Sequence, residues 1–500
     1  MLNSINLDDQ SYESIMDYIM SELPRLCPDW TDYNEHDPGI TILELFAWYK
    51  EMQQYHLNVV TDAIISKLLL LLGMKQLPET PARAIAELPE SCPPLPKLSR
   101  LRAPEDLAFE LEAAYNAPVK LRGVYAEDGD GTRSDLAAYF NQPNISAAPF
   151  AFGGVDTSLV LILENVTGDT INLYFEIEDR CAVPRNTFAA PAQVPRDIDW
   201  SADGVTLTLE KDETHALSQS GFIRFTPPAK TQTLCVKLTL RYSGCEEEVR
   251  LRSVSATKVP VVQRRTYSYY DGDTRLVYDS GGLPCLEVPL PAVEGEVIAN
   301  ELEILVRSDS GEYERWDFTP DIFSAAPGAK VFTLDAKREN LVFGDGEYGA
   351  VVPKGGDAII IAAFPISHLE RGNIPAGTLT IEATGQSAAN EAARGGCKAE
   401  TVRETARRLA LRLRNTNKCA SAEDFRRAAL STPGLRVASA EVRVGYDPDA
   451  PTGGSAYPVV TVNVLPANVN GTGLADARFL AAVYRHLNAK RPIGVAVRVM

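Results

Sequence analysis

Long apolar runs, paired cysteines and clustered histidines are all missing from this chain of 500 residues. No apolar run approaches the ~20 residues that a membrane-spanning helix needs, and the five leucines at residues 68–72 make only about one and a half turns of helix. The first 20 residues lack the basic stretch followed by an apolar stretch that marks a secretory signal. We therefore expect no direct membrane insertion, and synthesis and assembly in the cytoplasm.

The eight cysteines are scattered without any C-x-x-C pair, and none of the five histidines has a second one near it to complete a metal set. Isolated cysteines in a reducing compartment stay free and pack as small apolar groups. The loop at 127–132 has acidic residues but lacks the later ligands of a calcium-binding loop. Phosphate-cradling loops and nucleophile elbows are also missing. The sequence predicts no metal, no cofactor and no catalysis.

Positive charge is scarce overall and unevenly placed. The net charge is −18; residues 1–80 hold 13 acidic and 4 basic side chains, whereas residues 398–500 hold 8 acidic and 16 basic ones. A chain of this net charge is repelled by phosphate, which argues against nucleic acid as a partner. An acidic head and a basic tail favour head-to-tail contacts between subunits, because complementary fields steer association and fix register.

Length and patterning predict a multidomain α+β protein. At ~150 residues per domain, 500 residues are too many for one core. Three- and four-residue spacing of apolar side chains predicts an N-terminal helical segment over 1–77, with helices over about 9–23, 38–59 and 62–72. The first of these helices should stop before Pro24. Seven prolines follow between 78 and 104 and predict an extended linker there.

From residue 105 to 257 the apolar period becomes two, which predicts an antiparallel β-sandwich-like domain with strands over 159–163, 171–177, 205–209 and 234–240. A second β-rich domain is expected over 258–397, with a tight turn at Asp345-Gly346. Residues 398–500 read as an α+β domain that opens on a basic amphipathic helix ending at Arg414. Ser421 begins a second helix through a capping-box pattern.

The most informative stretch is Thr31–Trp48, which combines a helix start, an acidic cluster and an apolar helix. Asp37 is a good N-cap, and Pro38 suits the first helical position because its missing N–H is an orphan donor anyway. Beyond them, apolar side chains share one helical face at Ile42, Leu45, Phe46, Tyr49 and Met52. The short neighbouring helices cannot cover this face, so we expect it to be buried against another protein.

The same stretch carries several carboxylates, at Asp29, Asp32, Glu35, Asp37 and Glu44, beside His36. Paired carboxylates can act as general acid and base. Helix capping explains them better, because negative charge near a helix N-terminus is stabilising by ~0.3–1 kcal/mol. A tail-associated hydrolase using these groups is the weakest of the functions considered.

Three separated blocks share a family resemblance. The first is Tyr33–Trp48 with Leu69–Gly73, the second Phe343–Gly349 with Arg371–Gly377, and the third Ser421–Phe425, Pro433-Gly434 and Arg491–Gly494. Their order and spacing resemble the baseplate J-like wedge proteins of contractile phage tails and contractile injection systems. The residues that carry the motifs are Glu35, His36, Asp37, Pro38, Gly39, Gly344, Asp345, Gly346, Gly372, Asn373 and Pro375.

The resemblance implies a structural subunit rather than an enzyme. Its expected partners are other copies of itself or a companion wedge subunit, the spike hub, and the baseplate proteins next to the sheath. The N-terminal helices would join a helical bundle through Ile42, Leu45, Phe46 and Tyr49. Contacts between wedges would involve Arg403, Arg407, Arg412 and Arg414. The region 105–257 resembles the family only in being β-rich and reads as an insertion.

A rival interpretation is an adhesin or carbohydrate-binding tail protein built around the β-rich region at 105–257. Such a protein would expose clustered aromatic side chains. The aromatic residues Tyr174, Phe175 and Trp200 stand mostly at alternating strand positions and are predicted to belong to a core instead.

Overall fold

The computed structural model describes residues 10–34, 36–58, 61–115, 119–136, 150–152, 156–166, 170–189, 196–242, 244–245, 248–272, 274–335, 338–414, 418–449, 458–468 and 471–500. The chain divides into two compact units, Met1–Pro78 with Ala399–Asn415, and Glu79–Lys398 with Thr416–Met500. The first is called the helical unit below. Helices and several sheets are both present, which confirms the predicted multidomain α+β class.

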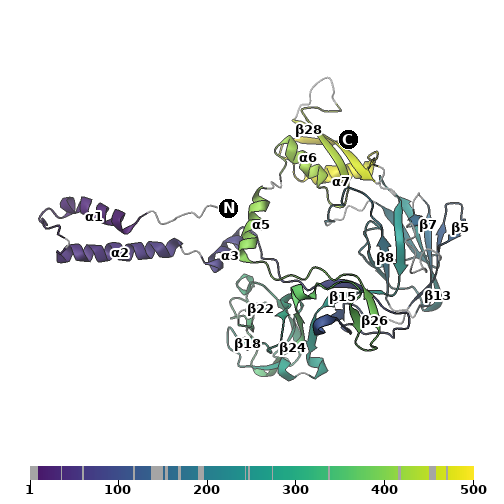
Figure 1. Ribbon diagram of the computed structural model, residues 1–500, viewed down its shortest axis with the longest axis horizontal. Helices are drawn as coiled ribbons and strands as arrows, with labels where there is room; N and C mark the ends of the chain where they lie inside the picture. Colours follow the sequence, from purple (N-terminus) through teal and green to yellow (C-terminus); the bar gives the residue numbers. More distant parts are fainter. Residues whose placement is uncertain are drawn as a thin grey trace. The chain divides into compact units, whose positions relative to one another are not determined.

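The helical unit contains α1 (Tyr12–Leu26), α2 (Pro38–Asn58), α3 (Asp62–Leu71) and α5 (Val402–Arg414). Helices α1 and α2 lie side by side, and α3 packs against α5 (Figure 1). The prediction that α1 stops before Pro24 is wrong. Pro24 lies in the last turn, where its missing N–H removes a single bond, and the Cys27 N–H closes the helix on the Leu23 carbonyl at 2.9 Å.

A closed barrel is assembled from segments that are far apart in sequence. The strand order is β1 (Arg83–Glu87), β15 (Lys258–Gln263), β3 (Ala108–Leu111), β2 (Arg100–Arg102), β25 (Leu379–Ile381) and β26 (Ser387–Asn390). Strands β3 and β15 are antiparallel, with Leu111 opposite Val261. Phe109, Leu111 and Val261 are fully buried in the barrel core.

This barrel corrects the expected linker over 78–104. The segment contains β1 and β2, and its prolines stand outside them, where no ladder N–H is required. Ala84 and Ala86 of β1 are buried at alternate positions. The density of prolines predicts an extended chain. It does not reveal β1, because the strands that pair with β1 lie more than 150 residues further along the sequence.

Two antiparallel sheets follow between β3 and β15 and share one core, as the sandwich prediction requires. The first sheet has the order β10 (Val205–Thr206), β9 (Asp197–Ala202), β13 (Thr231–Tyr242), β7 (Ser158–Val166), β4 (Lys120–Glu127) and β5 (Arg133–Asp135). The second has the order β11 (Leu209–Asp212), β12 (Gly221–Phe225), β8 (Ile171–Ile177), β14 (Val249–Ser255) and β6 (Phe150–Phe152). The strand expected over 205–209 is split between β10 and β11, which belong to different sheets.

The chain between β15 and β25 forms a further sheet. Its path is β16 (Arg265–Ser268), β24 (Gly355–Ser367), β20 (Glu303–Arg307), β21 (Tyr313–Phe318), β22 (Val331–Asp335), β23 (Asn340–Phe343) and β18 (Glu287–Pro289). Strands β17 (Val277–Ser280) and β19 (Glu296–Val297) also pair with β24. Short 3-10 helices connect parts of the β regions at Pro104–Asp106, Tyr269–Asp271, Thr274–Leu276, Ala299–Glu301, Ile322–Ser324 and Leu369–Gly372.

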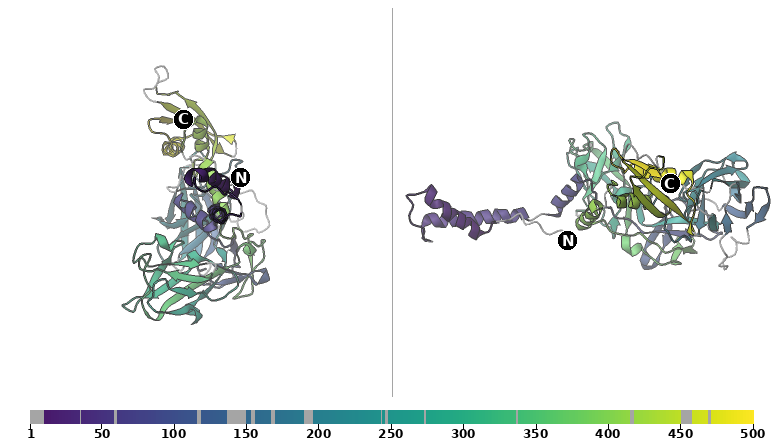
Figure 2. Two further views of the ribbon diagram at one scale, coloured as in Figure 1. Left: turned by 90° about the vertical axis from the view of Figure 1, so that its left-hand side faces the viewer. Right: turned by 90° about the horizontal axis from the view of Figure 1, so that it is seen from above.

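The C-terminal part contains β27 (Val437–Val444), β28 (Val459–Asn468), β29 (Gly471–Thr472) and β30 (Ala496–Val499), together with α6 (Ala422–Leu430) and α7 (Ala477–Asn488). The helices lie against the strands (Figure 2), and the buried side chains of both belong to one hydrophobic core. The Ser421 side chain accepts a hydrogen bond from the Asp424 N–H and the Asp424 carboxylate accepts one from the Ser421 N–H, which confirms the capping box. The basic helix α5 was expected in this domain; it belongs to the helical unit instead.

Candidate interaction surface of the helical unit

The start of α2 is built by the motif that stood out in the sequence. The Asp37 carboxylate accepts hydrogen bonds from the N–H groups of Gly39 at 2.8 Å and Ile40 at 3.2 Å, so the predicted cap is confirmed. The Trp30 ring lies so close to Gly39 that a Cβ there would come within 2.3 Å of it. The motif therefore joins the loop to the first turn of α2.

The remaining motif residues at this position have no chemical partner that points to catalysis. Pro38 is the first residue of α2. His36 is exposed, and its N–H faces the Asn34 side chain at 3.5 Å. Glu35 lies outside the described residues. Asp32 accepts a hydrogen bond from the Asn34 N–H at 3.1 Å and is exposed.

One face of α2 packs against α1. Ile40 and Ala47 are buried on it, and Glu51 on the same face accepts a hydrogen bond from the Tyr12 N–H of α1 at 3.0 Å. Positions 40, 47 and 51 are seven and four residues apart, so they lie along one side of the helix. The side chains that face α1 are thus few and partly polar.

The opposite face of α2 is the more apolar one, and it is exposed. It carries Ile42, Leu45, Phe46, Tyr49 and Met52, called the apolar strip below, whose side chains are between 41% and 63% exposed. Trp48 beside the strip is 50% exposed. A contiguous apolar surface of this kind marks an interaction site, because each such side chain gains about 1.5–3 kcal/mol on full burial.

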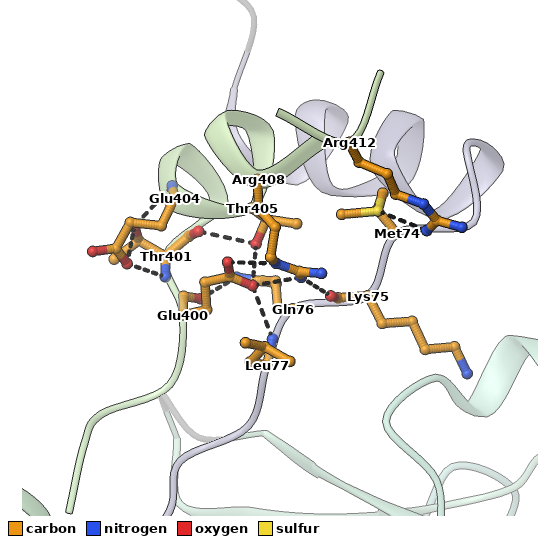
Figure 3. A network of polar contacts seen from close by, with 10 residues as sticks. All are labelled: Met74, Lys75, Gln76, Leu77, Glu400, Thr401, Glu404, Thr405, Arg408 and Arg412. Atoms are coloured by element: carbon orange, nitrogen blue, oxygen red, sulfur yellow. Dashed lines mark hydrogen bonds and ion pairs between the residues drawn. The ribbon is translucent and has the colours of Figure 1, made fainter. Parts of the chain in front are cut away.

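Helix α5 is fixed in the helical unit by the Glu400 carboxylate (Figure 3). This carboxylate accepts hydrogen bonds from the Leu77 N–H at 3.0 Å, the Thr405 hydroxyl at 3.0 Å, and the Arg408 guanidinium at 2.7 and 2.8 Å. The Glu400 N–H returns a bond to the Leu77 carbonyl at 2.9 Å. Hydrogen bonds from Arg408, followed by those from Leu77 and Thr405, outweigh desolvation and lower the pKa of Glu400 to about 2.

The arginines of α5 are divided by this network into two groups. Arg408 also donates to the Lys75 carbonyl at 2.5 Å, and Arg412 lies 3.3 Å from the Met74 sulfur, so both point toward the segment after α3 (Figure 3). Arg403, Arg407 and Arg414 are exposed. Hydrogen bonds from Thr401, with a smaller contribution from the Arg407 charge, lower the pKa of the neighbouring Glu404. Of the four arginines predicted from the sequence, Arg412 therefore contacts its own chain, and no local pattern marks Arg408 or Glu400 as residues of this site.

The second resemblance block forms a tight loop after β23. The Asp345 carboxylate accepts hydrogen bonds from the N–H groups of Tyr348 at 2.7 Å and Glu347 at 2.9 Å, which lower its pKa. A Cβ on Gly344 would come within 2.4 Å of the Gly349 backbone, and Gly346 has a φ of +97°. The expected turn is present, and hydrogen bonds to the Asp345 carboxylate stabilise its backbone.

The residues of the same block at 371–377 brace the barrel. Asn373 and Gly396 exchange two hydrogen bonds of 2.9 Å, and the Pro375 carbonyl accepts one from Thr378 at 2.9 Å. A Cβ on Gly372 would come within 2.7 Å of the buried Gln263 side chain. These motif residues therefore hold the backbone of this segment in place.

The β-rich region between β3 and β15 offers no aromatic binding face in its described part. Tyr174, Phe175 and Trp200 are buried, as predicted for core residues. Among the residues from 119 to 255 whose side-chain burial is described, no aromatic side chain reaches the exposed class. Glu127 in the calcium-like loop is paired with Lys237 at 2.5 Å and with Arg133 at 2.9 Å.

Metal and membrane sites are not found in the described part of the chain. No group of three or more metal-ligating side chains occurs there, and no helix there is long and apolar enough to cross a membrane. No disulfide joins any of the eight cysteines, all of which lie in the described part of the chain. Their packing differs from the prediction, because Cys27, Cys285 and Cys397 are exposed and only Cys92 and Cys419 are fully buried.

No family model and no curated protein matches this chain. Among solved structures, it resembles a chain of the type VI secretion system TssK-TssF-TssG baseplate subcomplex at 10% identity and a TM-score of 0.33, over 92% of this chain and 95% of that one. It also resembles a chain of the anti-feeding prophage (AFP) baseplate at 12% identity and a TM-score of 0.29, over 99% of this chain and 72% of that one. Both TM-scores are below 0.5, so neither likeness bears on the function.

Proposed function

We propose that this chain is a structural subunit of the baseplate of a phage-tail-like contractile injection particle. The observation that carries the proposal is the apolar strip of α2. A helix that packs its less apolar face against its neighbour and leaves its more apolar face in water is built to be covered by another protein. The three resemblance blocks support the same conclusion from the sequence.

In the proposed particle, the apolar strip enters a helical bundle formed with other copies of this chain or with a companion wedge subunit. The bundles close into a six-fold ring around the spike hub, next to the proteins that connect to the sheath. Assembly takes place in the cytoplasm. The chain contributes contacts and geometry, and the motif residues keep its loops and barrel in shape.

Electron microscopy of the native assembly tests the proposal. The chain is tagged in its host, a lysate is sedimented, and the heavy fraction is imaged with a label against the tag. We expect the label at the end plate of sheathed, tail-like particles. Recovery of the chain only as a small species, with no label on any particle, would contradict the proposal.

A further inference from the structure

We infer that the outer face of α5 docks on the outer face of α1 in a second copy of this chain, through arginine–carboxylate pairs. The outer face of α5 is Arg403, Arg407, Leu411 and Arg414, and the outer face of α1 is Glu13, Asp17 and Tyr18. This inference rests on the part of the proposed function in which copies of the chain assemble with one another, and it names the surfaces that meet.

The α5 face follows from the Glu400 network. Arg408 and Arg412 turn toward Glu400 and Met74 (Figure 3). The other three arginines of α5 are exposed, and helical spacing places them on the other side of the helix. Residues 403, 407, 411 and 414 are spaced by four, four and three positions, so they form one continuous stripe. Leu411, at its centre, is 60% exposed. The stripe combines three exposed guanidinium groups with an apolar side chain. A single carboxylate, Glu404, lies beside it, so its net charge stays positive.

The α1 face is the opposite of the side that packs on α2. Ile15 and Leu23 are buried, whereas Glu13 and Asp17 are exposed and form no ion pair with a described residue. Tyr18 beside them is 68% exposed. This face therefore has two uncompensated carboxylates and a large amphipathic ring.

The two faces match in spacing. Glu13 and Asp17 are four residues apart, as are Arg403 and Arg407, which places each pair about 6 Å apart along its helix axis. Two arginine–carboxylate pairs can then form in the same register. Leu411 lies one turn beyond Arg407 and Tyr18 is the residue after Asp17, so each face also has an exposed apolar side chain near its charged pair. Guanidinium groups bind carboxylates in a fixed fork geometry, which sets the orientation of the contact.

The opposite charges of the α1 and α5 faces make the contact head-to-tail. Residues 10–58 hold nine acidic and two basic side chains, whereas α5 holds five arginines and one glutamate. Two α1 faces repel each other, and so do two α5 faces, so each copy must use α5 on one side and α1 on the other. Repeated contacts of this heterologous kind generate a ring when the rotation closes.

Charge reversal in two separate variants tests the contact. The first variant carries Arg403→Glu and Arg407→Glu, and the second carries Glu13→Lys and Asp17→Lys. In each variant alone the two faces have like charge, so we expect self-association at low salt to weaken by about tenfold or more. In an equal mixture, each reversed face meets a partner of opposite charge on the other variant. We expect the mixture to recover the association of the original chain in analytical ultracentrifugation.

A matched control carries Lys97→Glu and Lys230→Glu, which change the net charge as the first variant does at exposed positions of the other unit. It should associate like the original chain. Recovery in the mixture also shows that both variants are folded.

An original chain that stays monomeric, a single variant that associates normally, or a mixture that does not recover would each overturn the inference. If the reversed variants still enter sheathed particles at the normal level, the inference fails while the proposed function stands; absence of the original chain from such particles would instead reject the proposed function.

Discussion

Glu400 sits where α5 meets the segment that follows α3, and its carboxylate accepts hydrogen bonds from three different residues. Two of these donors, Thr405 and Arg408, belong to α5, and the third is the backbone of Leu77. A single charged side chain thus joins parts of the chain that are more than 300 residues apart in sequence. It does so next to Met74, which is almost fully buried.

Replacing Glu400 with glutamine should loosen this junction. The glutamine oxygen can still accept the Leu77 N–H, but its NH₂ group faces the Arg408 guanidinium and cannot accept from it. Hydrogen bonds to charged groups contribute about 1.5–3 kcal/mol each, so we expect a loss of this order from the local free energy of unfolding. Amide hydrogen exchange at Leu77 measures it directly, and unchanged protection there would contradict the role given to Glu400.

Acid should loosen the same junction in a defined window. The pKa of Glu400 falls from 4.5 to about 2 in the folded chain, so the unfolded state binds more protons between these values. Its contribution to stability is complete above about pH 4.5 and is lost as the pH falls toward 2. The Glu400→Gln variant should lose less protection at Leu77 over this window than the original chain.

His486 on α7 gives the C-terminal part a different pH response. Burial, with a smaller effect of Lys490, lowers its pKa from 6.5 to about 4, and its buried Nε2 atom has no hydrogen-bond partner among the described residues. The unfolded state therefore takes up the proton first, and stability of this part should fall as the pH drops from 6.5 to 4. His486→Phe should flatten that fall, as measured by exchange of amides in α7; an unchanged pH profile would show that His486 is not its cause.

Polar residues that stabilise the fold differ in whether the sequence alone can predict their role. Asp37 and Ser421 cap helices two or three residues away, so the local pattern is sufficient to predict them. Glu110 is almost fully buried and bonds to Arg264 and Thr266, about 155 residues further on. No local pattern marks such a residue, because its partners are brought to it only by closure of the barrel.

At the scale of elements, α2 is predicted almost completely by its sequence. The cap, the first proline and the apolar periodicity are all local, and the helix begins and ends within one residue of its expected bounds. The strand expected over 205–209 fails because alternation continues across a position where the chain passes from one sheet to the other. Periodicity records which side of a strand is buried, but it does not record which sheet the strand joins.

The role of α2 leads to a prediction for its exposed face. Phe46→Asp places a charge in the middle of the apolar strip, where burial against a partner would cost several kcal/mol. We expect this variant to be missing from sheathed particles while its β regions stay folded, as judged by sedimentation of the lysate and by limited proteolysis of the purified chain.

Ser21→Asp is the control for this variant, because it adds the same charge at an exposed position of α1. It should enter particles at the normal level. Normal incorporation of the Phe46→Asp chain would reject the assignment of the apolar strip to the bundle.

At the scale of the whole molecule, the strand order of the barrel determines which segment can be deleted without unfolding the barrel. The two sheets of the sandwich begin after β3 and end before β15, and these two barrel strands pair directly with each other. The segment that can be treated as an insertion therefore starts after β3, and not at residue 105 as expected from the sequence. Phe109 and Leu111 belong to the barrel core and must stay.

Two deletions test this boundary. Replacing residues 116–256 with a short glycine–serine linker should leave the barrel closed, because β3 and β15 then form a hairpin. Removing residues 105–256 takes away β3 and should unfold the barrel. Hydrogen exchange of β1 and β25 distinguishes the two results, and equal protection in both variants would contradict the observed strand order.

Deletion of residues 116–256 should also destabilise the C-terminal part, which the same hydrogen-exchange experiment can measure. Arg185 and Asn186 donate hydrogen bonds of 2.9 Å to the carbonyls of Gly434 and Leu430, so the C-terminal part loses these anchors. Removing residues 398–500 instead takes away α5 and exposes Met74. We expect that truncation, unlike the deletion of 116–256, to unfold the helical unit and to abolish entry into particles.

The helical unit is completed by α5, which begins about 330 residues after the end of α3. At synthesis rates of about 5–20 residues per second, α3 leaves the ribosome roughly 15–60 s before α5 exists. Throughout that interval the side of α3 that later contacts α5 has no cover. The order of synthesis therefore leaves an apolar helix face uncovered for that interval, during which a chaperone or another early helix can occupy the place of α5.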